Sequence, residues 1–221
     1  MNNKPEVEFI FSEFGPKALR PPVENVKRFF PEAFFVHHTE KTVPELFDRT
    51  HPRWGWRAHD YWQCRGMAKS RADISIGMDS DMRIVSKDVQ AIVPLVQKFG
   101  LCFVAASRML VRVDAEIGAD SDGKLDESKG TGYCLSTAWM AVNRGNPGAV
   151  AVLEEACGLL LAGPARLPQL LWRACWKTGF APLILPQNWT VCSGDVGVGN
   201  EIVLHIGHKE VAEYYKGKYD A

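Results

Sequence analysis

The stretch ADISIGMDSDMRIVSKD, residues 72–88, decides how the rest of the chain is interpreted. Its apolar run 74–78 is typical of a buried strand, and Asp79 and Asp81 follow with only Ser80 between them. Residues i and i+2 of an extended chain project to the same side, so the two carboxylates are expected to converge. Two unit charges about 5 Å apart repel by roughly 3 kcal/mol at an effective dielectric near 20. A shared proton, a basic neighbour or a divalent cation must therefore offset the repulsion.

The position of this pair at the end of a strand favours ligand binding. Open α/β sheets bind ligands in the crevice beyond the carboxyl ends of their strands. The alternative is a surface turn in which one aspartate caps the next segment, which is common for a bare D-x-D motif. Because an apolar strand precedes the motif here, we favour a metal site.

Composition bounds the class of protein. The 221 residues are 46% hydrophobic and carry 26 basic and 26 acidic side chains, which suits one sizeable domain, residues 1–221. The net charge of zero argues against electrostatic binding of nucleic acid or an anionic membrane over a broad surface. The start of the chain has no signal-peptide pattern, no stretch is apolar enough for a membrane span, and the scattered cysteines form no C-x-x-C pair. These features predict a cytoplasmic protein with reduced core thiols.

Strand-like and helix-like segments alternate along the chain. Strands are predicted at 6–12, 32–39, 74–78, 101–106, 109–113, 133–142, 180–185 and 201–207, and helices at 21–30, 59–70, 88–99, 147–163 and 166–179. The polar, glycine-containing stretch 118–132 is expected to be a binding loop or a lid. Alternation of this kind favours an α/β layered sheet.

The C-terminal stretch IVLHIGHKE, residues 202–210, supplies a second polar element. His205 interrupts an otherwise apolar strand, and a lone histidine of this kind is more often a satisfied core residue than a ligand. With the two aspartates, however, it completes a sensible ligand set for Mn²⁺, and Mg²⁺ is also possible. His208 is a competing ligand, although strand alternation should turn it away. Lys209 is placed to hold a phosphate as a point charge.

These motifs together resemble GT-A-fold glycosyltransferases, in particular the retaining family that includes glycogenin and bacterial lipooligosaccharide galactosyltransferases. The family's strand-borne D-x-D matches Asp79-Ser80-Asp81, and its late metal-binding histidine, followed by glycine and lysine, resembles His205, Gly207 and Lys209. Its preceding helix, with a Tyr-x-x-x-Arg-like element, resembles residues 61–65. The stretch QLLWRACWKTGFAPLILPQNW, 169–189, also resembles a family segment. A chain of this length would be a minimal, viral or bacterial, version.

The resemblance implies a single-domain, GT-A-like (Rossmann-like) mixed sheet flanked by helices. Residues 1–115 would form a nucleotide-sugar-binding half, and 116–221 an acceptor-side half with the C-terminal metal-binding strand. It implies transfer of a sugar from a nucleoside diphosphate sugar, most simply a UDP-sugar, to a glycan or other small acceptor, with a retaining mechanism favoured. Asp79, Asp81 and His205 would hold Mn²⁺ or Mg²⁺, which would stabilise the leaving diphosphate as a Lewis acid.

Further donor-site candidates follow from the same resemblance. They are Phe11, Ser12 and Glu13 at the end of the first strand, Arg65 in the preceding helix, and Ser80, Gly207 and Lys209 within the motifs. Residues 11–13 lie where such folds hold the nucleoside base, but they could simply be a strand leaving the core. Arg65 could reach the donor sugar or a phosphate, or be a charge on the helix surface.

Besides the two aspartates, the sequence offers only a few catalytic candidates. The family's Asp-Gln-Asp segment corresponds to Leu167-Pro168-Gln169, which makes Gln169 a candidate. A base for an inverting reaction would be Asp195, in the glycine-rich stretch 192–200, or Glu155, although each is also an ordinary solvated carboxylate.

Three alternative classes compete with this interpretation. A haloacid-dehalogenase-like phosphotransferase would place its D-x-D after an early strand with threonine following, whereas Met82 and Arg83 follow here. A nucleotidyltransferase of similar fold would have a glycine-rich, basic N-terminal loop, of which SEFGPKALRPP, 12–22, is a faint version. A nucleotide-sugar or glycan-binding module without catalysis is the non-enzyme alternative, because no acidic residue adjoins Gln169. Such a module would bind the donor with Mn²⁺ but not turn it over.

Overall fold

The computed structural model describes residues 4–16, 19–51, 53–105, 135–163, 165–192 and 196–219. The strands are β1 (Val7–Glu13), β2 (Phe34–Thr39), β3 (Ile74–Met78), β4 (Met82–Ile84), β5 (Leu101–Ala105), β6 (Leu135–Asn143), β7 (Leu183–Leu185) and β8 (Val203–His205). The helices are α1 (Val23–Lys27), α2 (Trp54–Lys69), α3 (Ile92–Phe99), α5 (Pro147–Ala162), α6 (Leu167–Thr178) and α7 (Lys209–Tyr219), with 3-10 turns η1 (Lys87–Ala91) and η3 (Gln187–Trp189).

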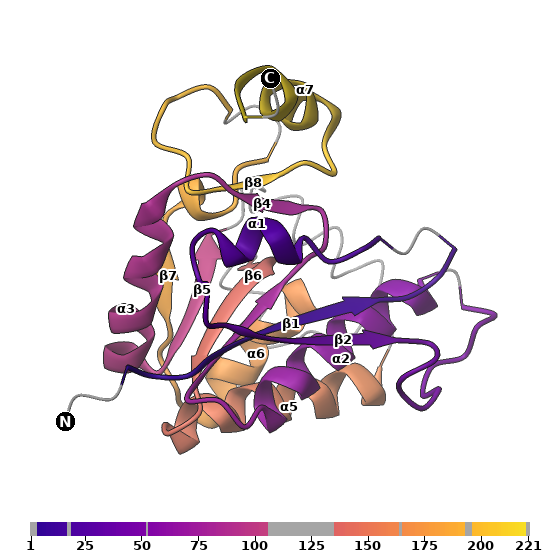
Figure 1. Ribbon diagram of the computed structural model, residues 1–221. Coiled ribbons are helices and arrows are strands. Elements are labelled where there is room, and N and C mark those ends of the chain that lie inside the picture. The colour runs from indigo at the N-terminus through magenta and orange to yellow at the C-terminus, as the bar shows by residue number, and fades with distance from the viewer. Residues whose placement is uncertain are drawn as a thin grey trace.

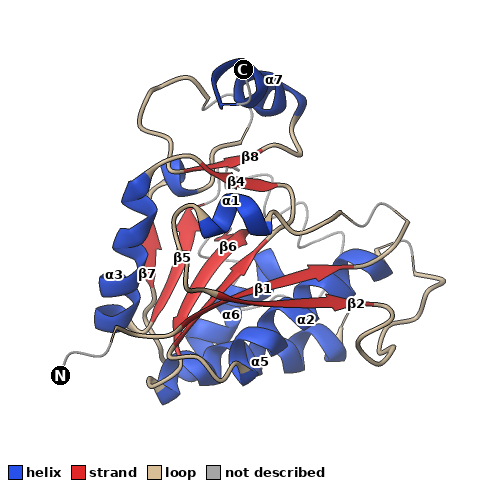
Figure 2. Ribbon diagram, viewed as in Figure 1, coloured by secondary structure: helices blue, strands red, loops and turns tan. Residues whose placement is uncertain are grey.

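Six strands form one mixed sheet in the order β2-β1-β3-β6-β5-β7 (Figures 1 and 2). β1 runs parallel to β2 and β3, and β7 runs parallel to β5. β6 lies antiparallel between β3 and β5. A separate two-stranded ribbon pairs β4 with β8. The predicted α/β mixed sheet flanked by helices is therefore confirmed.

The two faces of the sheet are covered by different helices. α2, α5 and α6 pack together on one face, while α1 and α3 cover the other (Figure 1). Successive side chains of β1 point to opposite faces of the sheet, so this strand contributes to the hydrophobic core on each face. Ile10 packs with α2, α5 and α6, whereas Phe9 and Phe11 pack on the opposite side. A third, smaller cluster joins α7 to β8 through Leu204, Val211 and neighbouring side chains.

Two glycines let α2 lie close against the sheet. A Cβ at Gly77 of β3 would come within 2.6 Å of Met67 Sδ, and one at Gly66 of α2 would come within 2.7 Å of the Ile10 side chain. Larger residues at either position would push the helix away, since such contacts are shorter than real side chains allow. The close approach brings the N-terminal half of α2 over the end of β3, where Asp79 follows.

Most predicted elements are present, with instructive differences at their ends. The strand predicted at 74–78 is β3 itself, whereas the helix predicted at 59–70 begins earlier, at Trp54. Residues 88–99 form a 3-10 turn followed by α3. The ribbon strand β4 and helix α7 were not predicted. The predicted strand 109–113 and the predicted loop 118–132 lie outside the described residues.

The described helices and cysteines bear on the expected class of protein. None of the described helices has the length and apolar composition that crossing a bilayer requires. The described cysteines are unpaired thiols, and all except Cys192 are buried. Cys134 lies outside the described residues.

Candidate functional site

The two aspartates of the D-x-D motif flank the turn that joins β3 to β4. The backbone of Asp79 still pairs with β6, because its N–H donates to the carbonyl of Ala138 at 3.0 Å. The chain then turns, and Met82 N–H donates to Asp79 O at 3.1 Å. Both aspartates therefore lie at the carboxyl end of β3, at the edge where open α/β sheets bind ligands.

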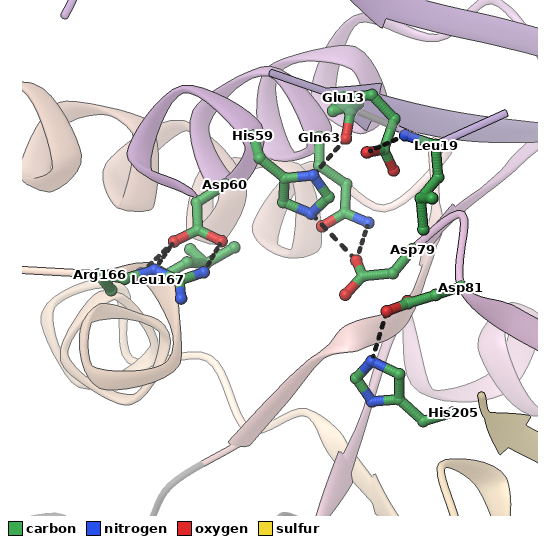
Figure 3. A network of polar contacts seen from close by, with 11 residues as sticks. Glu13, Leu19, His59, Asp60, Gln63, Asp79, Asp81, Arg166, Leu167 and His205 are labelled. Atoms are coloured by element: carbon green, nitrogen blue, oxygen red, sulfur yellow. Dashed lines mark hydrogen bonds and ion pairs between the residues drawn. The ribbon is translucent and has the colours of Figure 1, made fainter. Parts of the chain in front are cut away.

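His205 reaches this turn because β8 pairs with β4. In the antiparallel ribbon His205 lies opposite Met82, and Ile206 N–H donates to the Asp81 carbonyl at 2.8 Å. His205 Nε2 lies 3.2 Å from Asp81 Oδ2. One ligand atom from each of Asp79, Asp81 and His205 lies within 4.8 Å of the other two. The structure thus brings together the three residues that the sequence predicted as a metal site (Figure 3).

Helix α2 adds a histidine that the sequence analysis missed. His59 Nε2 lies 3.0 Å from Asp79 Oδ1, and its Nδ1 contacts the carbonyl of Ser12 at the end of β1. Figure 3 shows the imidazole between that strand end and Asp79. His59 therefore fixes the rotamer of one proposed ligand from the side opposite to His205. His59 and Gln63 are four residues apart and so share one face of α2, but this spacing alone does not indicate that the face lies against Asp79.

Gln63 is the second contact from α2. In the orientation drawn in Figure 3 its Nε2 donates to Asp79 Oδ1 at 3.4 Å. Rotating the amide by 180° lets the nitrogen donate to Thr137 O at 3.2 Å and the oxygen accept from Met78 N–H at 3.1 Å. We favour the rotated amide, because both of its atoms then face a partner of the correct polarity. Gln63 is fully buried, so it ties α2 to β3 and β6 beneath the site.

The imidazoles offset the repulsion between the two carboxylates. Burial alone would lower the pKa of His59, but the charge of Asp79 and the hydrogen bond to it raise that pKa to about 9. Burial alone would raise the pKa of Asp79, but His59 and His205 lower it. Burial opposes a charge on His205 as well, yet its contacts with Asp81 and Cys192 raise its pKa to about 10. Without a cation, these basic neighbours therefore offset the repulsion between the two carboxylates of the D-x-D motif.

Gly207, which has no side chain, lies beside the carboxylate of Asp81. A Cβ at Gly207 would be 2.2 Å from Asp81 Oδ2 and 3.4 Å from His205 Nε2. Only glycine leaves the space beside these ligand atoms open, because such a contact is too short for any other residue. Among the described residues, Asp79 Oδ2 and Asp81 Oδ1 have no hydrogen-bond partner. Oxygen atoms of this kind remain available to coordinate a cation.

Another carboxylate lies nearby and has a different environment. Asp60, fully buried in α2, accepts two hydrogen bonds from Arg166, at 2.9 and 2.8 Å, and one from Leu167 N–H at 3.1 Å. The Arg166 guanidinium also lies over the Trp56 ring, 5.1 Å from its centroid. Its charge contributes to lowering the pKa of Asp79. The pair connects α2 with the start of α6 beside the site (Figure 3).

The donor-site candidates at the ends of β1 and β3 differ in burial, because Phe11, Ser12 and Ser80 are buried whereas Glu13 is half-buried. Phe11 is fully buried and its ring lies in the core, while Ser12 is buried beside His59. Glu13 accepts a hydrogen bond from Leu19 N–H at 3.2 Å. Ser80 is buried within the turn, and Arg83 donates to its carbonyl at 3.0 Å.

The described partners of Arg65, Lys209 and Glu155 lie outside the cluster. The hydrogen bond from Lys69 lowers the pKa of Glu154 in α5, and the charge of Arg65 adds to this lowering, which indicates that Arg65 lies on the α5 side of α2. The Lys209 side chain is 91% exposed at the start of α7 and pairs with Glu213 at 3.8 Å. Glu155 pairs with Lys177. Gln169 lies in α6, and its side chain is outside the described part, as is the whole of Asp195.

Comparisons with known proteins support the fold. No protein-family model and no curated protein matches the sequence. A solved glycosyltransferase involved in glycosylation of the major capsid of PBCV-1 superposes with a TM-score of 0.59 at 11% identity, covering 96% of this chain and all of that one. The 2-C-methyl-D-erythritol 4-phosphate cytidylyltransferase from Thermus thermophilus superposes with a TM-score of 0.51 at 13% identity, covering 98% and 100%. At these identities the likeness concerns the fold, and the predicted GT-A-like architecture is confirmed.

Proposed function

We propose that the chain is a divalent-cation-dependent glycosyltransferase, which moves a sugar from a nucleoside diphosphate sugar to an acceptor. The observation that carries the proposal is the convergence of Asp79, Asp81 and His205 at the carboxyl end of β3. It is supported by a fold that matches a glycosyltransferase over nearly its full length. A UDP-sugar as donor, Mn²⁺ as the ion and a retaining outcome are the specific forms that we expect from the resemblance in sequence.

The chemistry of the donor set fits a divalent cation. Two carboxylates and one imidazole suit Mn²⁺, and Mg²⁺ is a weaker fit because it prefers oxygen ligands throughout. The Asp81 and His205 side chains are 26% and 20% exposed, so the cluster can be reached from solvent. Gly207 leaves room beside the ligand atoms where any larger residue would fill it.

Breaking the bond between the anomeric carbon and the diphosphate oxygen leaves negative charge on the diphosphate. A divalent cation bound here supplies Lewis-acid stabilisation of that charge. The chain's own part is to fix the ligands in advance, and His59 does so by holding Asp79 against β1. Preorganisation of this kind lowers the barrier because the site needs no rearrangement when charge develops. Lys209, on an exposed and adjustable side chain, adds a positive contact for a phosphate.

A nucleotidyltransferase is the second candidate, because the cytidylyltransferase superposes over almost the whole chain. The two reactions release different products from a nucleotide substrate. Sugar transfer or hydrolysis of a nucleoside diphosphate sugar releases the nucleoside diphosphate, whereas nucleotidyl transfer from a nucleoside triphosphate releases pyrophosphate. Measuring both products with a panel of donors therefore separates the two activities.

The decisive experiment compares two Asp→Asn variants. Nucleotide sugars are screened with the full chain for Mn²⁺-dependent release of nucleoside diphosphate, and the active donor is repeated with Asp81→Asn. Asp88→Asn is the matched control, since Asp88 is an exposed carboxylate at η1, away from the cluster. We expect Asp81→Asn to lose at least about 100-fold in rate, because even partners of metal ligands are worth 10–100-fold. Unchanged activity in Asp81→Asn, or none with any donor, would contradict the proposal.

A further inference from the structure

A second set of possible metal ligands surrounds the other nitrogen of His205. Cys192, His205 and His208 each offer one ligand atom, and these atoms lie within 4.8 Å of one another. Cys192 Sγ lies 3.7 Å from His205 Nδ1, on the side of the ring opposite to Asp81. The rings of His205 and His208 are 4.8 Å apart and close to perpendicular, at 86°. One imidazole therefore takes part in two groups of ligands with different chemical character.

The separation of sulfur and nitrogen matches a tetrahedral zinc site. With Zn–S of about 2.3 Å and Zn–N of about 2.1 Å, tetrahedral geometry puts the two ligand atoms about 3.6 Å apart. The observed 3.7 Å between Cys192 Sγ and His205 Nδ1 agrees with that spacing. A thiolate with two imidazoles is also a soft ligand set, which favours zinc over Mn²⁺ or Mg²⁺.

The backbone fixes the positions of all three residues. Val191 N–H donates to Val203 O, and His205 N–H donates to Val191 O, each at 2.9 Å, so the segment carrying Cys192 is tied to β8. A turn then brings His208 back, with its N–H donating to His205 O at 3.2 Å. The ligand spacing is thus set by main-chain hydrogen bonds on both sides of His205.

Cys192 also differs from the other described cysteines in access. Cys64, Cys102, Cys157 and Cys175 are buried in the core, whereas Cys192 is half-buried. A thiol must lose its proton to bind a metal ion, and that proton has to reach solvent. Among the described cysteines, Cys192 is therefore the one placed for metal chemistry.

The contact with Asp81 completes a familiar arrangement of a metal-ligating histidine. Such a histidine usually donates its second ring N–H to a carboxylate, which fixes its tautomer and makes it a better ligand. His205 Nε2 lies 3.2 Å from Asp81 Oδ2, so a metal on Nδ1 leaves Nε2 protonated and donating to Asp81. In that state Nε2 has no lone pair for an ion held by the two aspartates.

We propose that Cys192, His205 and His208 form a zinc site that competes, through His205, with the ion bound by Asp79 and Asp81. Zinc takes Nδ1 of His205, the thiolate of Cys192 and one nitrogen of His208, with solvent in the fourth position. The thiol proton is released to solvent. Zinc binding then removes one of three ligands from the neighbouring site and inhibits the transfer reaction. The zinc site stands on its own geometry, while the inhibition rests on the proposed function.

Alkylation of Cys192 tests the site without any enzyme assay. The metal-free full chain, reduced with a phosphine, is treated with iodoacetamide with and without Zn²⁺, and modification of Cys192 is followed by peptide mass spectrometry. We expect Zn²⁺ to slow alkylation at least about 10-fold, because a thiolate bound to zinc is not free to attack iodoacetamide. His208→Ala should abolish the protection, and Mg²⁺ should give none. His51→Ala, which removes an imidazole from the segment before α2, is the matched control and should remain protected.

Hydrolysis of the active donor tests the competition. With Mn²⁺ present, Zn²⁺ should inhibit the unaltered chain and His51→Ala but not His208→Ala, each rate being compared with that of the same protein without zinc. Equal inhibition of all three would place zinc at the aspartates and overturn the competition. Absence of protection in the alkylation assay would overturn the zinc site itself. If protection is found and lost in His208→Ala while no donor is hydrolysed, the zinc site is supported and the proposed transfer activity is what fails.

Discussion

A carboxylate within α2, Asp60, and one at the end of β3, Asp79, have different kinds of partner. Asp60 accepts two hydrogen bonds from the Arg166 guanidinium and one from a backbone N–H. Asp79 accepts from His59 on one oxygen, and its other oxygen has no partner among the described residues. Arginine stays charged under all conditions at which proteins fold, whereas histidine can release its proton.

The difference shows which carboxylate can exchange its partner for a cation. Asp60 is satisfied by a permanent charge, so it can only serve to join α2 to α6. Asp79 and Asp81 are balanced by imidazoles, and an incoming divalent cation can replace the positive charge that the imidazoles lose. The same residue type therefore has a structural role in one place and a proposed ligand role in the other, because of the partner's chemistry.

The largest effect is expected from breaking the structural pair. Asp60→Asn leaves the Arg166 guanidinium beside a neutral amide in a largely buried position. Removal of one member of a buried ion pair costs about 3–5 kcal/mol, and we expect the low end because the Arg166 side chain is 25% exposed. Urea unfolding at pH 7 measures the change. If the double variant Asp60→Asn/Arg166→Met does not recover part of the loss, the broken Asp60–Arg166 ion pair is not its cause.

The same substitution in the cluster should have a different signature. Asp79→Asn removes a proposed cation ligand, so Mn²⁺-dependent hydrolysis should fall at least about 100-fold, by the reasoning applied to Asp81. Its cost in folding free energy should be smaller than that of Asp60→Asn, because His59 can lose its proton when its partner is neutral. Parallel rate and urea measurements on the two variants provide the comparison. A loss of stability in Asp79→Asn equal to that in Asp60→Asn would contradict the distinction between permanent and titratable partners.

The pH dependence of stability should reveal the titratable partners. The pKa of His59 is raised from an ordinary 6.5 to about 9, so folding takes up a proton between these values. The stabilisation is complete below about pH 6.5 and is lost as the pH rises toward 9, with a slope of at most about 1.4 kcal/mol per pH unit for this group. His205, with its pKa raised to about 10, adds a loss of the same sign.

Urea midpoints at pH 6 and pH 8.5, with a chelator present, measure this loss. The range ends below the ordinary pKa of 9.0 for thiols, so burial of Cys102, Cys157 and Cys175 contributes little to it. His59→Gln keeps a polar group beside Asp79 but does not titrate, and it should flatten the dependence. A midpoint that rises from pH 6 to pH 8.5 in the unaltered chain would show that the imidazoles do not carry the charge assigned to them.

Most of the fold could be predicted from the sequence, because apolar runs and alternating patterns are local features of the chain. The apolar run before Asp79 predicted β3 at its true bounds, and alternation predicted β1. The ribbon strand β4 could not be predicted, since three residues carry too little periodicity to be distinguished from a loop. Helix α2 was predicted too short because Trp54, Gly55 and Trp56 resembled a connector in composition, although the helix begins there.

Of the residues that meet at the candidate metal site, only the three proposed ligands were predicted from the sequence. Asp79, Asp81 and His205 each interrupt or end an apolar segment, so each is visible in the sequence. His59 is not, because its contact with Asp79 depends on how closely α2 packs against the sheet, and Gly66 and Gly77 decide that distance through the fold. Cys192 was classed with the core thiols, since its exposure follows from the tertiary structure alone.

The smallest effect is expected at Gly207, which contributes no ligand to the cluster. In Gly207→Ala the new Cβ would lie 2.2 Å from Asp81 Oδ2, so the carboxylate or the turn must shift. Such a shift should weaken Mn²⁺ binding about 10-fold, the lower end of the effect of changing a metal ligand's surroundings. Stability should hardly change, because residue 207 is exposed and its backbone φ is not in the left-handed region. Gly217→Ala, where a Cβ meets nothing within 4 Å, is the control. Equal Mn²⁺ affinity in both variants, measured by calorimetry, would mean that the cation lies away from Asp81. The contrast between Asp60 as a structural carboxylate and Asp81 as a metal ligand would then no longer stand.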